Sequence, residues 1–203
     1  MKTIQRFIVS LFAALLATIF VSTPDAAPHQ KGDVKLQSIG PLATGPDGVL
    51  FVSDPKAASI IAIKTEAKPT DKSPGNFKVE GLNAKVAAVL GASVDQVRIV
   101  DLAVDSASKT AYMSVVRGQG ADANAVVVSV HPSGKIHVLS LKNVQHSVAK
   151  LSNAPADKET GTGRRRRNQR MESITDIAFV KGKVIVAGPV SYTHLTLPTI
   201  CSV

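Results

Sequence analysis

Short apolar stretches separated by turn-forming residues recur along the chain, and three of them follow one plan. They are IGPLATGPDGVLFVSD (39–54), IVDLAVDSASKTAYMSV (99–115) and ITDIAFVKGKVIVAG (174–188). Each combines a short apolar strand, a tight turn and a second strand of β-branched or apolar residues, which is the pattern of a β-hairpin. Leu42, Leu102 and Ile177 occupy the matching position, and each is followed by Ala. This in-phase repeat predicts copies of one antiparallel unit.

The middle repeat predicts four antiparallel strands in succession. After its first hairpin come the polar loop RGQGADAN, a strand over 125–130, the turn HPSG and a strand over 135–141. The first repeat predicts a third strand over 59–64 and a fourth over 77–80. Repeated four-stranded meanders are the blades of a β-propeller, which pack face to face around a channel.

We therefore expect an all-β chain that forms a partial β-propeller of about two and a half four-stranded blades. The domain is expected to span 27–188, with blade units near 39–80, 99–141 and 174–188. An immunoglobulin-like sandwich is the competing fold, but it does not account for the in-phase repeat.

One insertion, LNAKVAAVLGASVDQV (82–97), replaces the strand pattern with helical spacing. The apolar positions of one helical face are Leu82, Val86, Val89 and Leu90. Asn83 is a candidate for the start of the helix and Gly91 for its C-terminal cap. We expect a short helix that packs over the seam between the first two blades, with a partner-binding helix as the alternative.

Residues 1–26 have the pattern of a secretory signal peptide. Lys2 and Arg6 precede an apolar run over 7–21, and small or turn-forming residues lead to Ala26, the expected cleavage point. The run is shorter than the roughly 20 residues of a membrane span. We expect a periplasmic or secreted protein with no stable membrane span after signal removal; an uncleaved anchor is the alternative.

The last residues, VSYTHLTLPTICSV (190–203), do not continue the repeat. Read back into codons, they match the reverse complement of a transposase-type sequencing adapter, followed by an index and a stop codon. We therefore expect 189–203 to derive from an adapter, Gly188 to be the last fully native residue, and the propeller to be truncated. A real C-terminal tail is the alternative. The one cysteine, Cys201, lies in this stretch, so the rest must be stabilised by its own core.

The chain has a formal net charge of +9, and five of its arginines lie close together in SNAPADKETGTGRRRRNQRME (152–172). These arginines form a candidate basic patch: Arg164, Arg165, Arg166, Arg167 and Arg170. The segment has turn-forming residues and no apolar periodicity, which predicts a solvated loop. An acidic partner or a protease-sensitive site are its functional interpretations. Because it contains no aromatic residue that could stack on bases, no nucleic acid is expected as a partner.

The repeated hairpins resemble those of secreted β-propellers of the NHL and SMP-30/gluconolactonase-like kind, whose blades carry patterns such as GPDGVLFVSD. The stretches IVDLAV and ESITDIAFVKGKVIVAG are also similar to a group of uncharacterised exported bacterial propeller proteins. For a gluconolactonase-like enzyme, the resemblance implies a divalent metal ion at the channel mouth, bound by a Glu just before a Gly-Pro pair. Ile39 stands before Gly40 and Pro41 here, which argues against that activity.

A carboxylate recurs at the start of the first strand in two repeats, as Asp101 and Asp176, whereas the first repeat has Pro41 there. First strands line the channel of a propeller, so these side chains are expected to approach one another, with Glu172 nearby. Such oxygen ligands suit Ca²⁺ or Mg²⁺. The alternative is that the aspartates bind backbone amides and fix the blades, with no cofactor.

These patterns favour an exported propeller that binds or scaffolds an unknown protein or small-molecule ligand. A metal-dependent lactonase or hydrolase of the gluconolactonase-like class is the alternative, and binding of acidic polymers through the arginines is a third hypothesis. The sequence shows no standard nucleophile arrangement and leaves open whether the chain is an enzyme.

Overall fold

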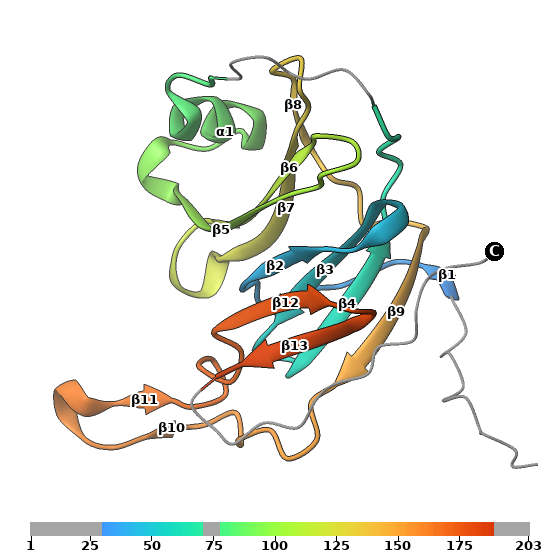
Figure 1. Cartoon of the computed structure of the whole chain (residues 1–203). Helices are drawn as coiled ribbons and strands as arrows, with labels where there is room; N and C mark the ends of the chain where they lie inside the picture. Colours follow the sequence, from blue (N-terminus) through green and yellow to red (C-terminus); the bar gives the residue numbers. More distant parts are fainter. Residues whose placement is uncertain (1–29, 71–77, 189–203) are drawn as a thin grey trace, which may run out of the picture.

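The computed structural model describes residues 30–70 and 78–188 (Figure 1). These residues form antiparallel β-sheets and one α-helix, which confirms the all-β fold class. The expected signal peptide (1–26) and the expected adapter-derived tail (189–203) lie outside the described residues. No helix in the described ranges has the length and apolar character needed to cross a bilayer.

The largest sheet, called sheet A, has five antiparallel strands in the order β1-β9-β4-β3-β2. Its strands are β1 (Gln30–Gly32), β2 (Leu42–Thr44), β3 (Val49–Asp54), β4 (Ser59–Lys64) and β9 (Val144–Lys150). A 3-10 turn over Pro46–Gly48 joins β2 to β3. The expected first hairpin and the expected third strand of the first repeat are therefore present.

The fourth strand of sheet A comes from a distant part of the chain. The prediction placed it over 77–80, but the described residues of that segment are not in a strand. Instead β9 pairs with β4, with Ile61 opposite Val148. Residues 78–80 precede the helix and do not pair with β4. The free edge of β4 pairs instead with β9, which follows sheet B in the chain.

The second repeat forms a separate four-stranded sheet, called sheet B, in the order β5-β6-β7-β8. Its strands are β5 (Val97–Val104), β6 (Ala111–Arg117), β7 (Asn124–Val130) and β8 (Ile136–Val138). The predicted meander of four successive antiparallel strands is confirmed. The last strand is shorter than the predicted 135–141.

Two small hairpins complete the described chain. They are β10 (Glu159–Thr160) with β11 (Arg167–Asn168), and β12 (Asp176–Val180) with β13 (Lys183–Ala187). The pair β12–β13 is the predicted hairpin of the third repeat. The pair β10–β11 lies within the segment that was predicted to be a loop. That prediction missed the hairpin because its strands are short and carry no apolar alternation.

Sheet A is the middle layer of the molecule (Figure 1). Phe51 and Ile60 on one of its faces pack with Ile177 and other residues of β12–β13, and the Phe51 and Phe179 rings stack with centroids 5.3 Å apart. On the opposite face, Leu50, Val52 and Ile61 pack with Tyr112 of sheet B. Burial on both faces explains why β3 and β4 are nearly continuous apolar runs.

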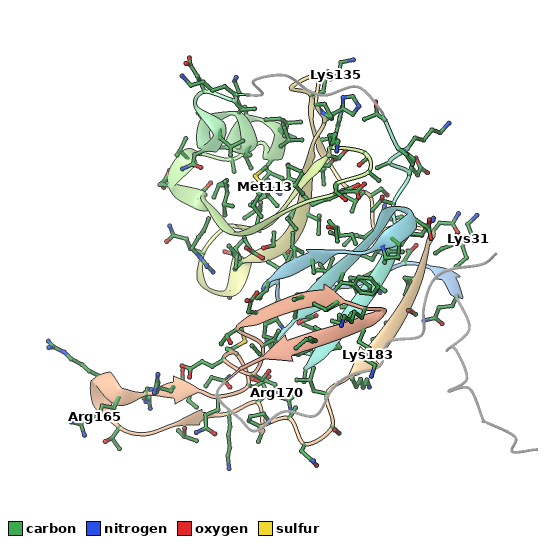
Figure 2. The ribbon with its side chains drawn as sticks, viewed as in Figure 1. Lys31, Met113, Lys135, Arg165, Arg170 and Lys183 are labelled. Carbon is green, nitrogen blue, oxygen red and sulfur yellow. The ribbon has the colours of Figure 1, made fainter. Side chains whose placement is uncertain are left out.

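The helix α1 (Leu82–Leu90) covers the face of sheet B that points away from sheet A. Val86 and Leu90 pack there against Met113 (Figure 2). The expected position over the seam between the first two repeats is therefore wrong. The outward face of β6 carries the apolar residues Met113 and Val115, and α1 buries them.

The ends of α1 follow the sequence pattern in part. Gly91 ends the helix in a left-handed conformation with φ of 60°, as predicted. Gly81, rather than Asn83, precedes the first helical residue, with φ of 61°. Val89 is exposed although the pattern placed it on the buried face.

Candidate functional site

A β-bulge in β5 precedes Asp101, and the side chain of Asp101 contacts sheet A. The register of β5 against β6 shifts between Ile99 and Asp101, so one extra residue enters β5. The carboxylate Oδ2 of Asp101 accepts a hydrogen bond of 2.8 Å from the backbone N–H of Leu42 in β2. Asp101 therefore links β5 to β2, as expected of an aspartate that binds a backbone amide and fixes neighbouring strands.

Asp101 and Asp176 line one pocket, although they lie in different repeats. Its volume is about 390 Å³, which is within the range of small-molecule sites. The pocket lies where β2 neighbours both β5 and β12. Its polar lining includes Arg98, Asp101, Thr175 and Asp176, and its apolar lining includes Ile39, Val100, Met171 and Ile174. That the two carboxylates approach one another stays a prediction; the structure shows that both residues line this pocket.

The wall formed by Ile39, Gly40 and Pro41 is fixed by the end of β3. The buried Asp54 carboxylate accepts hydrogen bonds from the N–H groups of Gln37 and Ser38, at 2.7 and 3.0 Å. Ser53 donates its hydroxyl proton to the carbonyl of Pro41 at 2.8 Å. These bonds hold the segment before β2 against sheet A, so the pocket has a preformed wall.

The third predicted ligand, Glu172, has a different partner. Its Oε1 lies 3.3 Å from Nε of Arg167, and Glu172 is not among the pocket-lining residues. Asp176 is exposed, and its Oδ1 accepts a hydrogen bond from the N–H of Ile177. Within the described ranges, no three His, Cys, Asp or Glu side chains gather as a metal site. The side chain of Ile39, which lines the pocket, supplies no ligand atom.

Charge and shape define what this pocket can do. Two carboxylates and one guanidinium face a partly apolar cavity. An amine or hydroxyl of a ligand can bind Asp176, and a carboxylate of the same ligand can bind Arg98, because both side chains are exposed at the rim. The arrangement suits binding of a small polar molecule.

The predicted basic patch divides into two parts (Figure 2). Arg164, Arg165, Arg166 and Arg167 are exposed on the β10–β11 hairpin, which projects from the sheets. Arg170 lies at the base of the hairpin, where its Nε donates to the carbonyl of Pro155 and its Nη1 lies 3.5 Å from the carbonyl oxygen of Lys56. Arg170 therefore anchors the hairpin and is not part of the exposed charge.

The structure also contains a second groove, which the sequence did not predict. It has a volume of about 660 Å³ and runs along β8 and the end of β4, with Lys31, Lys64, His137 and Lys142 in its lining. Thr65, which is also in the lining, accepts through its Oγ1 a hydrogen bond of 3.1 Å from the hydroxyl of the buried Tyr112. These residues are scattered over four segments, so no local motif could have indicated the groove.

Comparison of the chain with protein-family models, curated proteins and solved structures gives no match.

Proposed function

We propose that this chain is a binding protein built from propeller-type repeats, which takes a small polar ligand at the pocket of Asp101 and Asp176. The observation that carries the proposal is that carboxylates from two repeats line one cavity beside the first strands. The resemblance to NHL and gluconolactonase-like propellers supports the repeat architecture, as does the face-to-face packing of sheets B, A and β12–β13. The signal-like pattern of residues 1–26 supports action in the periplasm or outside the cell.

The charges of the pocket narrow the ligand class. Arg98 complements a carboxylate, and Asp176 complements a positively charged amine. A small zwitterion such as an amino acid satisfies both. The apolar wall of Ile39, Val100 and Ile174 can cover a short side chain of the ligand.

A metal-dependent lactonase remains the second candidate, since two carboxylates in one cavity can hold part of the coordination shell of Ca²⁺. Ile39 and the Glu172–Arg167 ion pair count against it, because they leave only two carboxylates in the pocket, where a protein site usually has more oxygen ligands of this kind.

Thermal unfolding followed by circular dichroism tests both functions, because the chain has no Trp for fluorescence. We expect L-alanine, L-lysine or L-glutamate to raise the Tm in the presence of a chelator, and Asp176→Asn to remove the effect. Asp122→Asn, an exposed aspartate on the β6–β7 turn, is the matched control and should respond like the original chain. A Tm raised by Ca²⁺ alone and lost in Asp176→Asn favours the lactonase. No response to any of these probes overturns the proposed pocket function.

A further inference from the structure

Two hairpins of this chain share one turn conformation. The turn between β6 and β7 contains Gly118 and Gly120 with φ of 88° and 57°. The turn between β10 and β11 contains Gly161 and Gly163 with φ of 90° and 55°. Each pair is followed by a 3-10 turn, over Gly120–Asp122 in the first case and Gly163–Arg165 in the second. The second turn carries the arginines.

The agreement extends to the flanking backbone. Gln119 and Thr162, between the glycines, have φ and ψ of −135° and 156°, and of −130° and 149°. The N–H of Ala123 bonds the carbonyl of Gly120 at 3.4 Å, and the N–H of Arg166 bonds that of Gly163 at the same distance. The two turns therefore have the same shape.

The glycines set this shape, since a Cβ on Gly118 would lie 2.6 Å from the carbonyl oxygen of Asp122, and one on Gly161 would lie 2.5 Å from that of Arg165. The positions after the second glycine are held by Ala121, Asp122 and Ala123 in one turn and by Arg164, Arg165 and Arg166 in the other. The turn therefore does not need arginine, and the charge requires another explanation.

The surrounding residues neutralise little of that charge. Arg166 pairs with Glu159 at 3.5 Å and Arg167 with Glu172 at 3.3 Å, and all four side chains are more than a third exposed. Exposed pairs of this kind contribute little to stability. Among the described residues, Arg164 and Arg165 have no ion-pair partner within 4.0 Å. The adjacent positive charges repel one another and raise the electrostatic free energy of the hairpin. Binding of an anion would lower it.

We propose that the β10–β11 hairpin is a docking site for an acidic polysaccharide. Guanidinium groups bind carboxylate and sulfate through two parallel hydrogen bonds, and a charged sugar chain presents such groups in series. The hairpin projects from the body of the protein, so a polymer can reach it (Figure 2). Segment 152–172 has no aromatic side chain, and stacking of bases is therefore not available to favour nucleic acid.

The chain supplies its own substitute sequence for the test. In the hairpin variant Arg164→Ala, Arg165→Asp and Arg166→Ala, the turn acquires the residues found between β6 and β7. A control variant removes the same formal charge elsewhere through Lys31→Ala, Lys135→Asp and Lys183→Ala, which lie on other strands and turns (Figure 2). Both are compared with the original chain by calorimetric titration with heparin oligosaccharide and with polygalacturonate, over a series of salt concentrations.

We expect the original chain and the control variant to bind at least one polysaccharide, with affinity that falls as salt rises. The hairpin variant should lose at least tenfold in affinity at low salt, while its Tm stays within a few degrees of the original. Equal binding by the hairpin variant and the original overturns the proposal, as does the absence of binding to both polysaccharides. A duplex DNA of equal length that binds more tightly than either polysaccharide also overturns it, in favour of a nucleic-acid partner.

Discussion

The carboxylate of Asp101 accepts a hydrogen bond from the backbone N–H of Leu42, and this bond links sheet B to sheet A. Leu42 lies in β2 of sheet A, and Asp101 lies in β5 of sheet B. Their relationship shows how a recurrent aspartate can hold neighbouring sheets in register while also lining a pocket.

Replacing Asp101 by Ala should lower the free energy of unfolding by about 1–3 kcal/mol, because the N–H of Leu42 loses its acceptor. Asp101→Asn keeps an acceptor oxygen and should cost less. Urea unfolding at neutral pH measures the difference. Asp176→Ala is the control, since Asp176 is exposed and bonds only the next amide. Equal losses for the Asp101→Ala and Asp176→Ala variants would contradict a linking role for Asp101.

Tyr112 should make stability fall at high pH. Burial raises the pKa of its hydroxyl, the Asp105 carboxylate raises it further, and the hydrogen bond with Thr65 acts in the opposite direction. The folded protein therefore keeps a proton that the unfolded chain releases near the ordinary pKa of about 10. The stabilising contribution is complete below that pH and is lost as the pH rises through the folded pKa.

The free energy of unfolding, measured with urea at several pH values between about 8 and 11, should show this loss, because the interval includes the unperturbed pKa of tyrosine. The Tyr112→Phe variant should show a smaller decline over the same interval. Parallel curves for the two proteins would show that Tyr112 is not the group responsible.

Substitution of Gly118 should be more harmful than substitution of Gly120. Both residues have positive φ, which costs roughly 1–2 kcal/mol for alanine. A Cβ on Gly118 also meets the backbone carbonyl of Asp122, whereas one on Gly120 has open space around it. Chemical denaturation should therefore rank Gly118→Ala below Gly120→Ala in stability. The reverse order would mean that the turn relaxes easily.

Self-association is expected in solution, because apolar side chains are exposed at both ends of the stack of sheets. Leu102 and Val104 on β5 are 49% and 52% exposed, and Val180 and Ile185 on β12–β13 are 44% and 41% exposed. Uncovered sheet faces and strand edges favour pairing between chains. Sedimentation velocity should detect species larger than a monomer, and Val180→Lys with Ile185→Lys should reduce them. A single monomeric species of the original chain would contradict this prediction.

Local patterns were sufficient for several elements. The Gly-Pro-Asp-Gly and Lys-Gly turns, with the apolar residues around them, predicted the hairpins β2–β3 and β12–β13. Helical spacing and Gly91 predicted α1 and its end. Matching positions in the repeated pattern also predicted that Asp101 and Asp176 approach one another; both line one pocket, and their approach stays a prediction. In each case neighbours in the sequence, or an equal place in a repeat, carry the information.

The sequence by itself thus determined the antiparallel β class, the main hairpins and the meander of sheet B, because turns and alternation act over a few residues. Only the tertiary structure decided that β9 would complete sheet A, that α1 would cover the far face of sheet B, and that Glu172 would turn to Arg167. Those outcomes depend on which distant segments bury the apolar faces of the sheets and pair with their free strand edges. Such packing and pairing bring together residues that are far apart in the chain, so no local sequence pattern indicates them.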